Sequence, residues 1–157
     1  MIEPMNSLEL KIPPPAIAAL VAAAMWALSR VTPLIPIPMG IRQLLALAVA
    51  LVGIAFSAAG VISFRRANTT LNPTKPQLTS SLVSSGIYAV TRNPMYVGLL
   101  FLLIAWAIFL SSAWALLGPA AYFIYIGRFQ IAPEERALTA LFGAEYATYL
   151  SKVRRWL

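Results

Sequence analysis

The stretch NPMYVGLLFLLIAWAIFLSSAWALLGPAAYFIYIG, residues 93–127, contains no charged side chain over 35 positions. As one straight helix it would be about 52 Å long at 1.5 Å per residue, far more than the roughly 30 Å hydrocarbon core of a bilayer. Two shorter helices folded into a hairpin fit that thickness better. We predict the turn at Ser111-Ser112, with Gly118-Pro119 as a kink or an alternative turn. The stretch therefore indicates a helical hairpin in a membrane.

The composition of the whole chain supports a membrane protein. Of its 157 residues, 60% are hydrophobic and 11% are charged. Soluble domains carry about 25% charged residues, so lipid is the better solvent for this chain. The formal net charge is +7, but the basic residues are thinly spread between apolar runs. They fit anionic lipid headgroups better than nucleic acid, so we expect membrane lipids and no nucleic acid as partners.

The missing residue types narrow the chemistry. The chain has no cysteine and no histidine. Disulfides, thiolate metal sites and a cysteine nucleophile are therefore excluded, and so are the commonest general base and the commonest metal ligand. We expect no metal. Any catalysis must use carboxylates, basic side chains, tyrosine, hydroxyls or an organic cofactor.

Two more spans are predicted before the hairpin. Residues 12–29 form an uncharged run of 18 residues, and residues 43–64 form one of 22, both long enough to cross a bilayer. Residues 31–40 are apolar but contain three prolines, which predicts a bent connection. The expected fold is an all-α polytopic membrane bundle of about four transmembrane helices, in a single domain over residues 1–157.

The distribution of Lys and Arg predicts the orientation. With four spans, ten basic residues fall on the side that carries both termini, and Arg30 and Arg42 fall on the other. By the positive-inside rule, both termini and the polar loop over residues 65–92 should face the cytosol. The ten residues on that side are Lys11, Arg65, Arg66, Lys75, Arg92, Arg128, Arg136, Lys152, Arg154 and Arg155.

The C-terminal segment, residues 132–157, predicts an amphipathic helix on the cytosolic side. Pro133 suits the first helical position, and Glu134 and Glu135 suit the positive end of the helix dipole. Trp156, beside two arginines, is typical of an anchor at the membrane interface. Apolar side chains recur at helical spacing on one face: Leu138, Leu141, Phe142, Tyr146 and Tyr149.

Each polar cluster has a simple structural interpretation. Arg92 fits a snorkelling residue at the interface, Asn93 fits a helix cap, and Pro94 fits a helix start. Glu134 and Glu135 fit a helix start equally well. However, charges at membrane depth are by default functional candidates, and these are two of only five acids in the chain.

Taken together, the clusters resemble a known family. The order G-x-Y-x-x-x-R-N-P-x-Y-x-G, an apolar hairpin, then E-E-x-x-L-x-x-x-F-G-x-x-Y-x-x-Y is similar to the isoprenylcysteine carboxyl methyltransferases and their phospholipid methyltransferase relatives. The resemblance covers roughly residues 64–157 and leaves the first two spans, residues 1–63, unassigned. The residues that carry it are Gly86, Tyr88, Arg92, Asn93, Pro94, Tyr96 and Gly98, then Glu134, Glu135, Leu138, Phe142, Gly143, Tyr146 and Tyr149.

This resemblance implies a cofactor, a site and an acceptor. The cofactor is S-adenosylmethionine, in a cytosol-facing pocket built by residues 64–157, and the acceptor is lipidic or prenylated and enters from the bilayer. Those enzymes commonly have R-H-P, where this chain has Asn93 in place of the histidine. The expected cofactor-binding residues are Gly86, Tyr88, Asn93, Pro94, Tyr96, Gly98, Glu134 and Glu135. The chemistry of methyl transfer makes Arg92, Arg128, Glu134 and Glu135 the candidate catalytic residues.

The chemistry of methyl transfer agrees with these residue types. Displacement at a sulfonium methyl group needs chiefly position and electrostatics, so no histidine or metal is required. Arg92 or Arg128 could hold an acceptor carboxylate, which is the acceptor that we expect first. An amine acceptor must lose a proton, and a glutamate would then be the natural base.

Two alternatives from other classes remain. A steroid-reductase-like NADPH enzyme would share R-x-P-x-Y-x-G, but that family often has a glutamate after the glycine, where this chain has Leu99. A non-enzymatic membrane scaffold or small transporter would use the same residues as caps and anchors. Binding of S-adenosylhomocysteine or of NADPH discriminates among the three.

Overall fold

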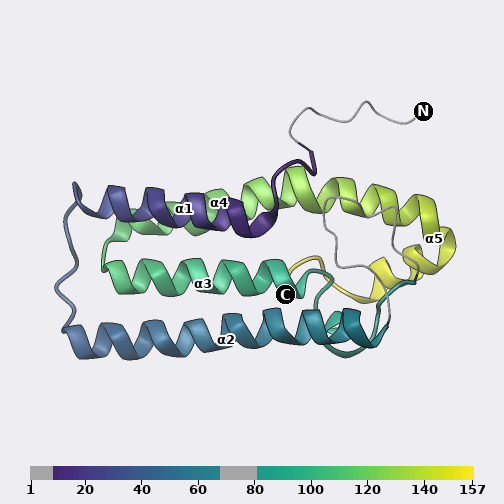
Figure 1. Cartoon of the computed structure of the whole chain (residues 1–157), viewed down its shortest axis with the longest axis horizontal. Helices are drawn as coiled ribbons and strands as arrows, with labels where there is room; N and C mark the ends of the chain where they lie inside the picture. The colour runs from purple at the N-terminus through teal and green to yellow at the C-terminus, as the bar shows by residue number, and fades with distance from the viewer. Residues whose placement is uncertain (1–8, 68–80) are drawn as a thin grey trace.

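The computed structural model describes residues 9–67 and 81–157, and that part of the chain is helical (Figure 1). Its only extended pairing is a single bridge between Thr91 and Arg154. The prediction of an all-α fold is therefore confirmed. The five α-helices are α1 (Pro14–Ser29), α2 (Met39–Arg66), α3 (Pro94–Leu110), α4 (Leu117–Ile126) and α5 (Ala132–Lys152).

The predicted hairpin is present, and its turn lies where the sequence indicates. Helix α3 ends at Leu110, and Ser111 takes a left-handed backbone conformation with φ of 53°. Ser111 also donates its hydroxyl to the carbonyl of Ile35 at 2.8 Å, so the proline-rich connection packs against this turn. Gly118-Pro119 lies inside the first turn of α4, not at the reversal.

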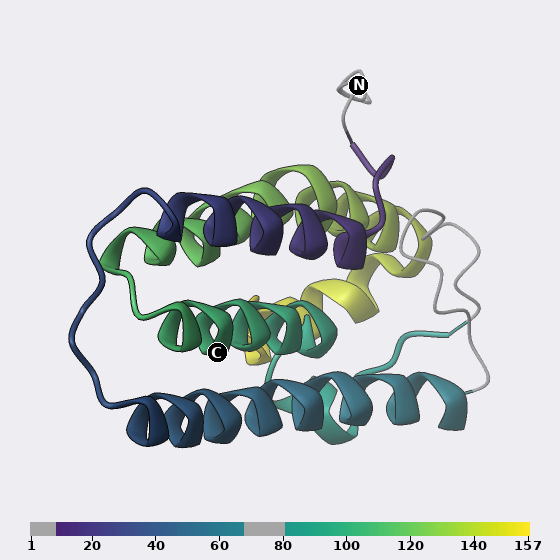
Figure 2. The same ribbon diagram turned by 60° about the vertical axis from the view of Figure 1, so that its left-hand side comes forward.

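Helix α3 lies at the centre of the bundle. Helix α2 packs along one side of it, and α1 and α4 pack on the other (Figure 2). The approach of α2 to α3 is close because Gly53 and Gly98 face each other, so that a Cβ added to Gly98 would lie 2.5 Å from the Gly53 carbonyl oxygen. The core between α1, α3 and α4 includes Ile17, Met25, Leu103, Ala107, Tyr122 and Ile126.

One helix in the described ranges, α2, is long and apolar enough to cross a bilayer alone. It has 28 residues, and many of its large apolar side chains are exposed, among them Leu44, Leu47 and Leu51. Helices α1 and α3 are apolar but shorter, with 16 and 17 residues. A membrane location is supported, while the four-span topology stays a prediction.

The C-terminal helix differs from the prediction. It is not a separate amphipathic helix, because α4 continues into α5 through a π-helical segment, Gly127–Ile131. The break comes later, at Gly143, whose φ of 48° and ψ of −118° are outside the helical range. This break turns the helix, so the predicted apolar face is not continuous: Leu141 is 46% exposed, whereas Tyr146 is buried.

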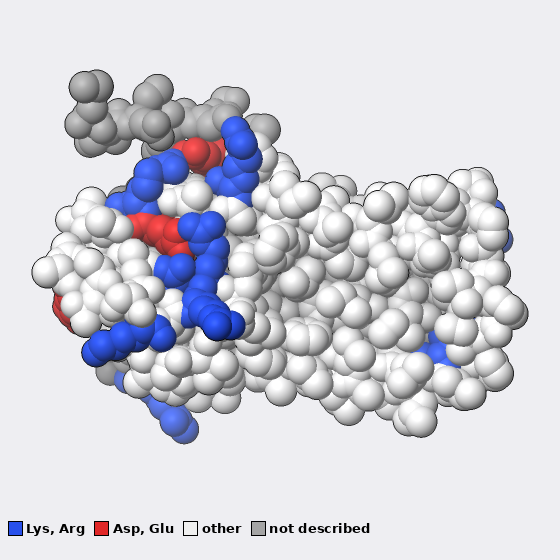
Figure 3. All heavy atoms as spheres, turned by 180° about the vertical axis from the view of Figure 1, so that it is seen from behind, with Lys and Arg blue, Asp and Glu red and all other residues white. Residues whose placement is uncertain are grey.

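Charge is segregated along the long axis of the molecule. Figure 3 shows Lys, Arg, Asp and Glu gathered at the end that carries α5, with small basic patches at the opposite end. Arg30 follows α1 and Arg42 lies near the start of α2, at that opposite end. Lys75 lies outside the described residues. This distribution agrees with the predicted grouping of charges, and which end faces the cytosol stays a prediction.

Candidate functional site

The candidate site lies at the charged end, where three segments meet. These are Thr91 to Asn93, which lead into α3, the first turn of α5 with Glu134 and Glu135, and the tail that follows α5. The segments are distant in sequence, and the hairpin returns α5 to the level at which α3 begins (Figure 1). This arrangement agrees with the prediction that residues 92–94 and residues 134–135 lie at the same end of the bundle.

Tyr88 is fixed by a tight 3-10 turn, Gly86–Ala89. Gly86 has φ of 62°, in the left-handed region that glycine adopts without strain. Tyr88 is buried, its ring meets Phe64 of α2 edge-on at 5.2 Å between centroids, and its carbonyl accepts a 2.6 Å hydrogen bond from the Tyr149 hydroxyl. This turn therefore ties α2 to the end of α5.

Glu134 is the acceptor of two short hydrogen bonds. The Tyr96 hydroxyl donates to its Oε1 atom at 2.6 Å, and the Gln130 side-chain amide donates to the same atom at 2.5 Å. Burial raises the pKa of Glu134 to about 7, although the two hydrogen bonds favour the charged form and oppose that rise. Glu134 is thus a carboxyl group that can gain or lose a proton near neutral pH.

Glu135 is an ion-pair centre. Arg155 binds it with two donors, Nε to Oε1 at 3.1 Å and Nη2 to Oε2 at 2.5 Å. Arg92 approaches from the other side, with Nη2 at 3.3 Å from Oε1. The Nε atom of Arg92 is buried and has no hydrogen-bond partner within residues 9–67 and 81–157. The two adjacent glutamates therefore have different partners: Glu134 is bound by neutral side chains and Glu135 by cationic ones.

The C-terminal tail forms part of the site, which the sequence did not indicate. The Arg92 amide donates to the Arg154 carbonyl at 3.0 Å, next to the bridge between Thr91 and Arg154. Trp156 stacks on Phe123 of α4 at 4.6 Å between centroids. Trp156 is partly buried against the protein core, and its role as an anchor at the membrane interface stays a prediction.

Asn93 has a different role from the predicted cap. It occupies the N-cap position of α3, but its side chain makes no capping hydrogen bond. Its side-chain amide nitrogen, Nδ2, instead donates to the backbone carbonyl of Arg155 at 2.8 Å. Pro94 is the first residue of α3, as predicted, and is buried. The backbone amide of Asn93 donates a hydrogen bond to the Thr91 hydroxyl at 3.2 Å. The side chain of Asn93 therefore holds the C-terminal tail in place.

Two predicted site residues lie apart from this cluster. Gly98 faces α2, where an added Cβ would collide with the carbonyl of Gly53 and the hydroxyl of Ser57. Arg128 is exposed, and its guanidinium lies over the Phe129 ring at 5.7 Å from the centroid. The ion-pair partners of Glu135 in the described residues are Arg92 and Arg155 instead. Of the four proposed catalytic residues, Arg92, Glu134 and Glu135 converge.

Sequence reasoning missed two contributors to this cluster. Nothing in the sequence marks Gln130 as a site residue, because an isolated polar residue in an apolar run fits an ordinary contact between helices equally well. The sequence predicts Arg155 only as one of several basic residues near the C-terminus. Tyr146 and Tyr149, which follow Glu134 and Glu135 in the predicted motif, are both buried. Burial raises the pKa of each phenol. No group of three acids in the described residues could hold a metal ion.

Comparison with known proteins gives a family. The sequence profile of the phospholipid methyltransferases matches residues 41–145, which include most of α2, all of α3 and α4, and most of the candidate site. An uncharacterized protein of Haemophilus influenzae is 48% identical over 63 residues, which are 40% of this chain and the whole of that relative. No solved structure matches. The profile covers more than half of the chain, which therefore belongs to the phospholipid methyltransferase family.

Proposed function

We propose that the protein is an integral membrane S-adenosylmethionine-dependent methyltransferase whose acceptor is a lipidic amphiphile. The observation that supports it most is the convergence of Arg92, Glu134 and Glu135 at the charged end of an apolar bundle. A water-soluble cofactor can reach that end, while an acceptor with an apolar tail can approach from the bilayer. We also propose a multi-pass topology with this end in the cytosol, on the basis of the Lys and Arg distribution.

The residues at the site fit the cofactor. The buried Nε of Arg92 has no hydrogen-bond partner among the described residues, and the carboxylate of a bound cofactor could satisfy it. Glu135 can accept hydrogen bonds from an amine or a ribose, and the buried ring of Tyr96 offers an aromatic face to a cation. When bound, S-adenosylmethionine supplies an electrophilic methyl group on a sulfonium. We propose that Gly86, Tyr88 and Pro94 shape this region through the backbone.

Glu134 favours an amine acceptor. A protonated amine is not a nucleophile, so its proton must leave before the nitrogen lone pair can attack a methyl carbon. A carboxylate with a pKa of about 7 can take that proton near neutral pH, and Tyr96 and Gln130 hold it in place. We therefore propose that the acceptor is the amine of a phospholipid headgroup and that Glu134 is its base.

A carboxylate acceptor, as in the isoprenylcysteine carboxyl methyltransferases, is the second candidate. It is favoured by the Nε of Arg92, which lacks a partner in the part of the chain that the structure describes and could bind a carboxylate. It is disfavoured because both neighbouring guanidiniums already pair with Glu135, and Arg128 lies elsewhere. An ionised carboxylate would also need no base, which leaves Glu134 without a role.

Cofactor binding tests the proposal first. Purified protein in detergent is titrated with S-adenosylhomocysteine and with NADPH, and the melting temperature is followed. We expect stabilisation by the first and not by the second. Stabilisation by NADPH alone would support the reductase alternative, and stabilisation by neither would leave a scaffold. Labelled S-adenosylmethionine with a lipid extract or a prenylated cysteine peptide then separates amine from carboxylate acceptors.

A further inference from the structure

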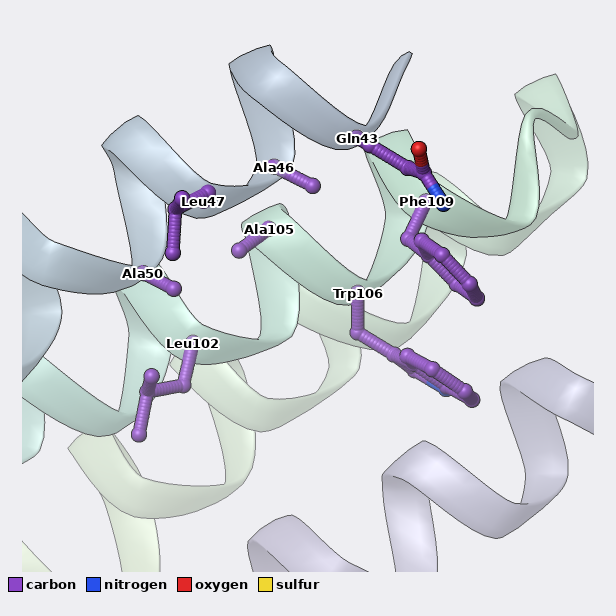
Figure 4. Close-up of a pocket in the computed structure, with 8 residues that line it drawn as sticks. All are labelled: Gln43, Ala46, Leu47, Ala50, Leu102, Ala105, Trp106 and Phe109. Atoms are coloured by element: carbon purple, nitrogen blue, oxygen red, sulfur yellow. The ribbon is translucent and has the colours of Figure 1, made fainter. Parts of the chain in front are cut away.

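An apolar groove lies between α2 and α3, at the end of the molecule opposite the candidate site. Its volume is about 490 Å³, within the range of roughly 300 to 1,000 Å³ that is usual for ligand pockets. Small residues of both helices form its floor, including Ala46, Ala50 and Ala105, and larger side chains form its walls (Figure 4). The other lining residues are Gln43, Leu47, Leu102, Trp106 and Phe109.

The aromatic wall of the groove is held in place. Trp106 donates its indole N–H to the carbonyl of Ala22 in α1 at 3.1 Å. The Phe109 ring stacks on Trp106 with 5.5 Å between centroids and 13° between planes. Figure 4 shows both rings projecting from the same side of α3. The groove is therefore a preformed shape with a fixed wall.

One end of the groove is polar and cationic. Gln43 lines that end beside Phe109 (Figure 4). The guanidinium of Arg42 lies over the Phe109 ring at 5.6 Å from the centroid. Its Nε atom is buried and has no hydrogen-bond partner in the described ranges, and its Nη2 atom donates to the sulfur of Met39. Arg42 thus has donor capacity that the described protein does not use.

No described acid balances this charge. Glu9 pairs with Arg136 of α5, and the other described acids are in α5 itself, so all of them lie at the site end (Figure 3). At the groove end the described charges are Arg30 and Arg42. An apolar groove with an arginine at its mouth is complementary to an amphiphile with an anionic head.

We propose that this groove binds an acyl chain of an anionic phospholipid, whose phosphate accepts hydrogen bonds from Arg42. Guanidinium groups bind phosphate through charge-assisted hydrogen bonds, and Arg42 is partly exposed, so that its terminal nitrogens rather than the buried Nε atom are the donors. The site is distinct from the proposed methyl-transfer site, because it lies at the other end of α2 and α3. It does not depend on the proposed function.

Fluorescence quenching tests the site. Trp26 and Trp114 are both more than half exposed and are replaced by Phe, and Trp156 is replaced by Phe in the same protein, so that Trp106 is the remaining tryptophan. The protein is placed in vesicles that contain phosphatidylglycerol or phosphatidylcholine brominated on the acyl chains. We expect an apparent preference of about fivefold for the anionic lipid, which corresponds to one basic residue at a membrane surface. Equal quenching by the two lipids would overturn the proposal.

Two further variants locate the interaction. Arg42→Gln should abolish the preference, whereas Arg30→Gln, which removes the other charge at this end, should leave it. Equal losses in both variants would mean that the charge acts diffusely, and the proposal would be wrong. If Arg42→Gln fails to fold, Ala50→Leu fills the groove and leaves the charge intact. It should abolish the preference, and an unchanged preference would contradict an occupied groove.

Discussion

Tyr96, in the first turn of α3, donates a hydrogen bond of 2.6 Å to Glu134, in the first turn of α5. The two residues are 38 positions apart, and the hairpin brings them together. This bond joins the two halves of the candidate site. It also stabilises the charged form of a carboxyl group whose pKa burial raises to about 7.

Tyr96→Phe should shift the pH dependence of activity to higher pH. The substitution removes a hydrogen bond that favours the Glu134 carboxylate, so the pKa of Glu134 should rise further. If Glu134 accepts the acceptor's proton, the midpoint of the pH–rate profile should move upward by about one unit. Tyr125→Phe, on α4 against Phe129, is the control and should leave the midpoint unchanged. A profile that is the same in both variants would exclude Glu134 as the base.

Glu134→Gln should flatten the pH dependence of stability. The folded protein retains the Glu134 proton up to about pH 7, whereas the unfolded chain releases it near the ordinary value of 4.5. The resulting stabilisation is present below pH 4.5 and is lost as the pH rises through 7, on the order of 3 kcal/mol. Melting temperatures between pH 4.5 and pH 8 measure it.

The matched control for that experiment is Glu145→Gln, because Glu145 is an exposed acid of the same helix. It should keep the wild-type decline in melting temperature. If Glu134→Gln shows the same decline as the control, Glu134 is not the group whose protonation changes on unfolding.

Several features of the fold were predictable because they follow from local physics. The hairpin follows from an uncharged stretch too long for one span, and the start of α3 follows from the fixed φ of Pro94. For Arg92 and Glu135, the sequence predicts only that both residues lie at the same end of the bundle. Their contact depends on the length of the hairpin arms, which the pattern indicates to within a few residues.

Other features could not be read from the sequence. The tail is held largely by backbone groups, including the Arg92 amide and the Arg154 carbonyl, and backbone pairing leaves no side-chain signature. The π-helical segment before α5 lacks a sequence signal as well: Pro133 lies in the first turn of α5 as predicted, but nothing in the sequence shows that α4 continues into it. Gly98 fits both a cofactor approach and close helix packing, because both require the absence of a side chain.

Gly98→Ala should destabilise the protein through the contact between α2 and α3. The added Cβ would lie 2.5 Å from the carbonyl oxygen of Gly53, and backbone cannot move away cheaply. We expect a loss of about 1 to 3 kcal/mol, seen as a lower melting temperature. Gly127→Ala, with nothing within 4 Å of its Cβ, is the control and should be neutral or stabilising. An unchanged melting temperature with lost S-adenosylhomocysteine binding would instead support the cofactor prediction for Gly98.

Arg155→Gln should weaken cofactor binding, because Arg155 orients Glu135. Its two donors fix the carboxylate from the tail side, while Arg92 approaches from the α3 side. Arg155 is partly exposed, so the ion pair itself should add only about 0.5 to 1 kcal/mol to folding stability. The larger effect should be on the Kd for S-adenosylhomocysteine, which we expect to rise several-fold by calorimetry.

A double-mutant cycle separates orientation from a general effect of charge. In a Glu135→Gln background, Arg155→Gln should have no further effect on Kd, since the carboxylate that it orients is gone. Arg154→Gln removes an equal charge, but Arg154 contributes its backbone carbonyl to the site and its side chain is exposed. It should therefore bind S-adenosylhomocysteine as the wild type does. If Arg154→Gln weakens binding as much as Arg155→Gln, the tail acts through its net charge, and the assigned contact with Glu135 is not what positions the cofactor.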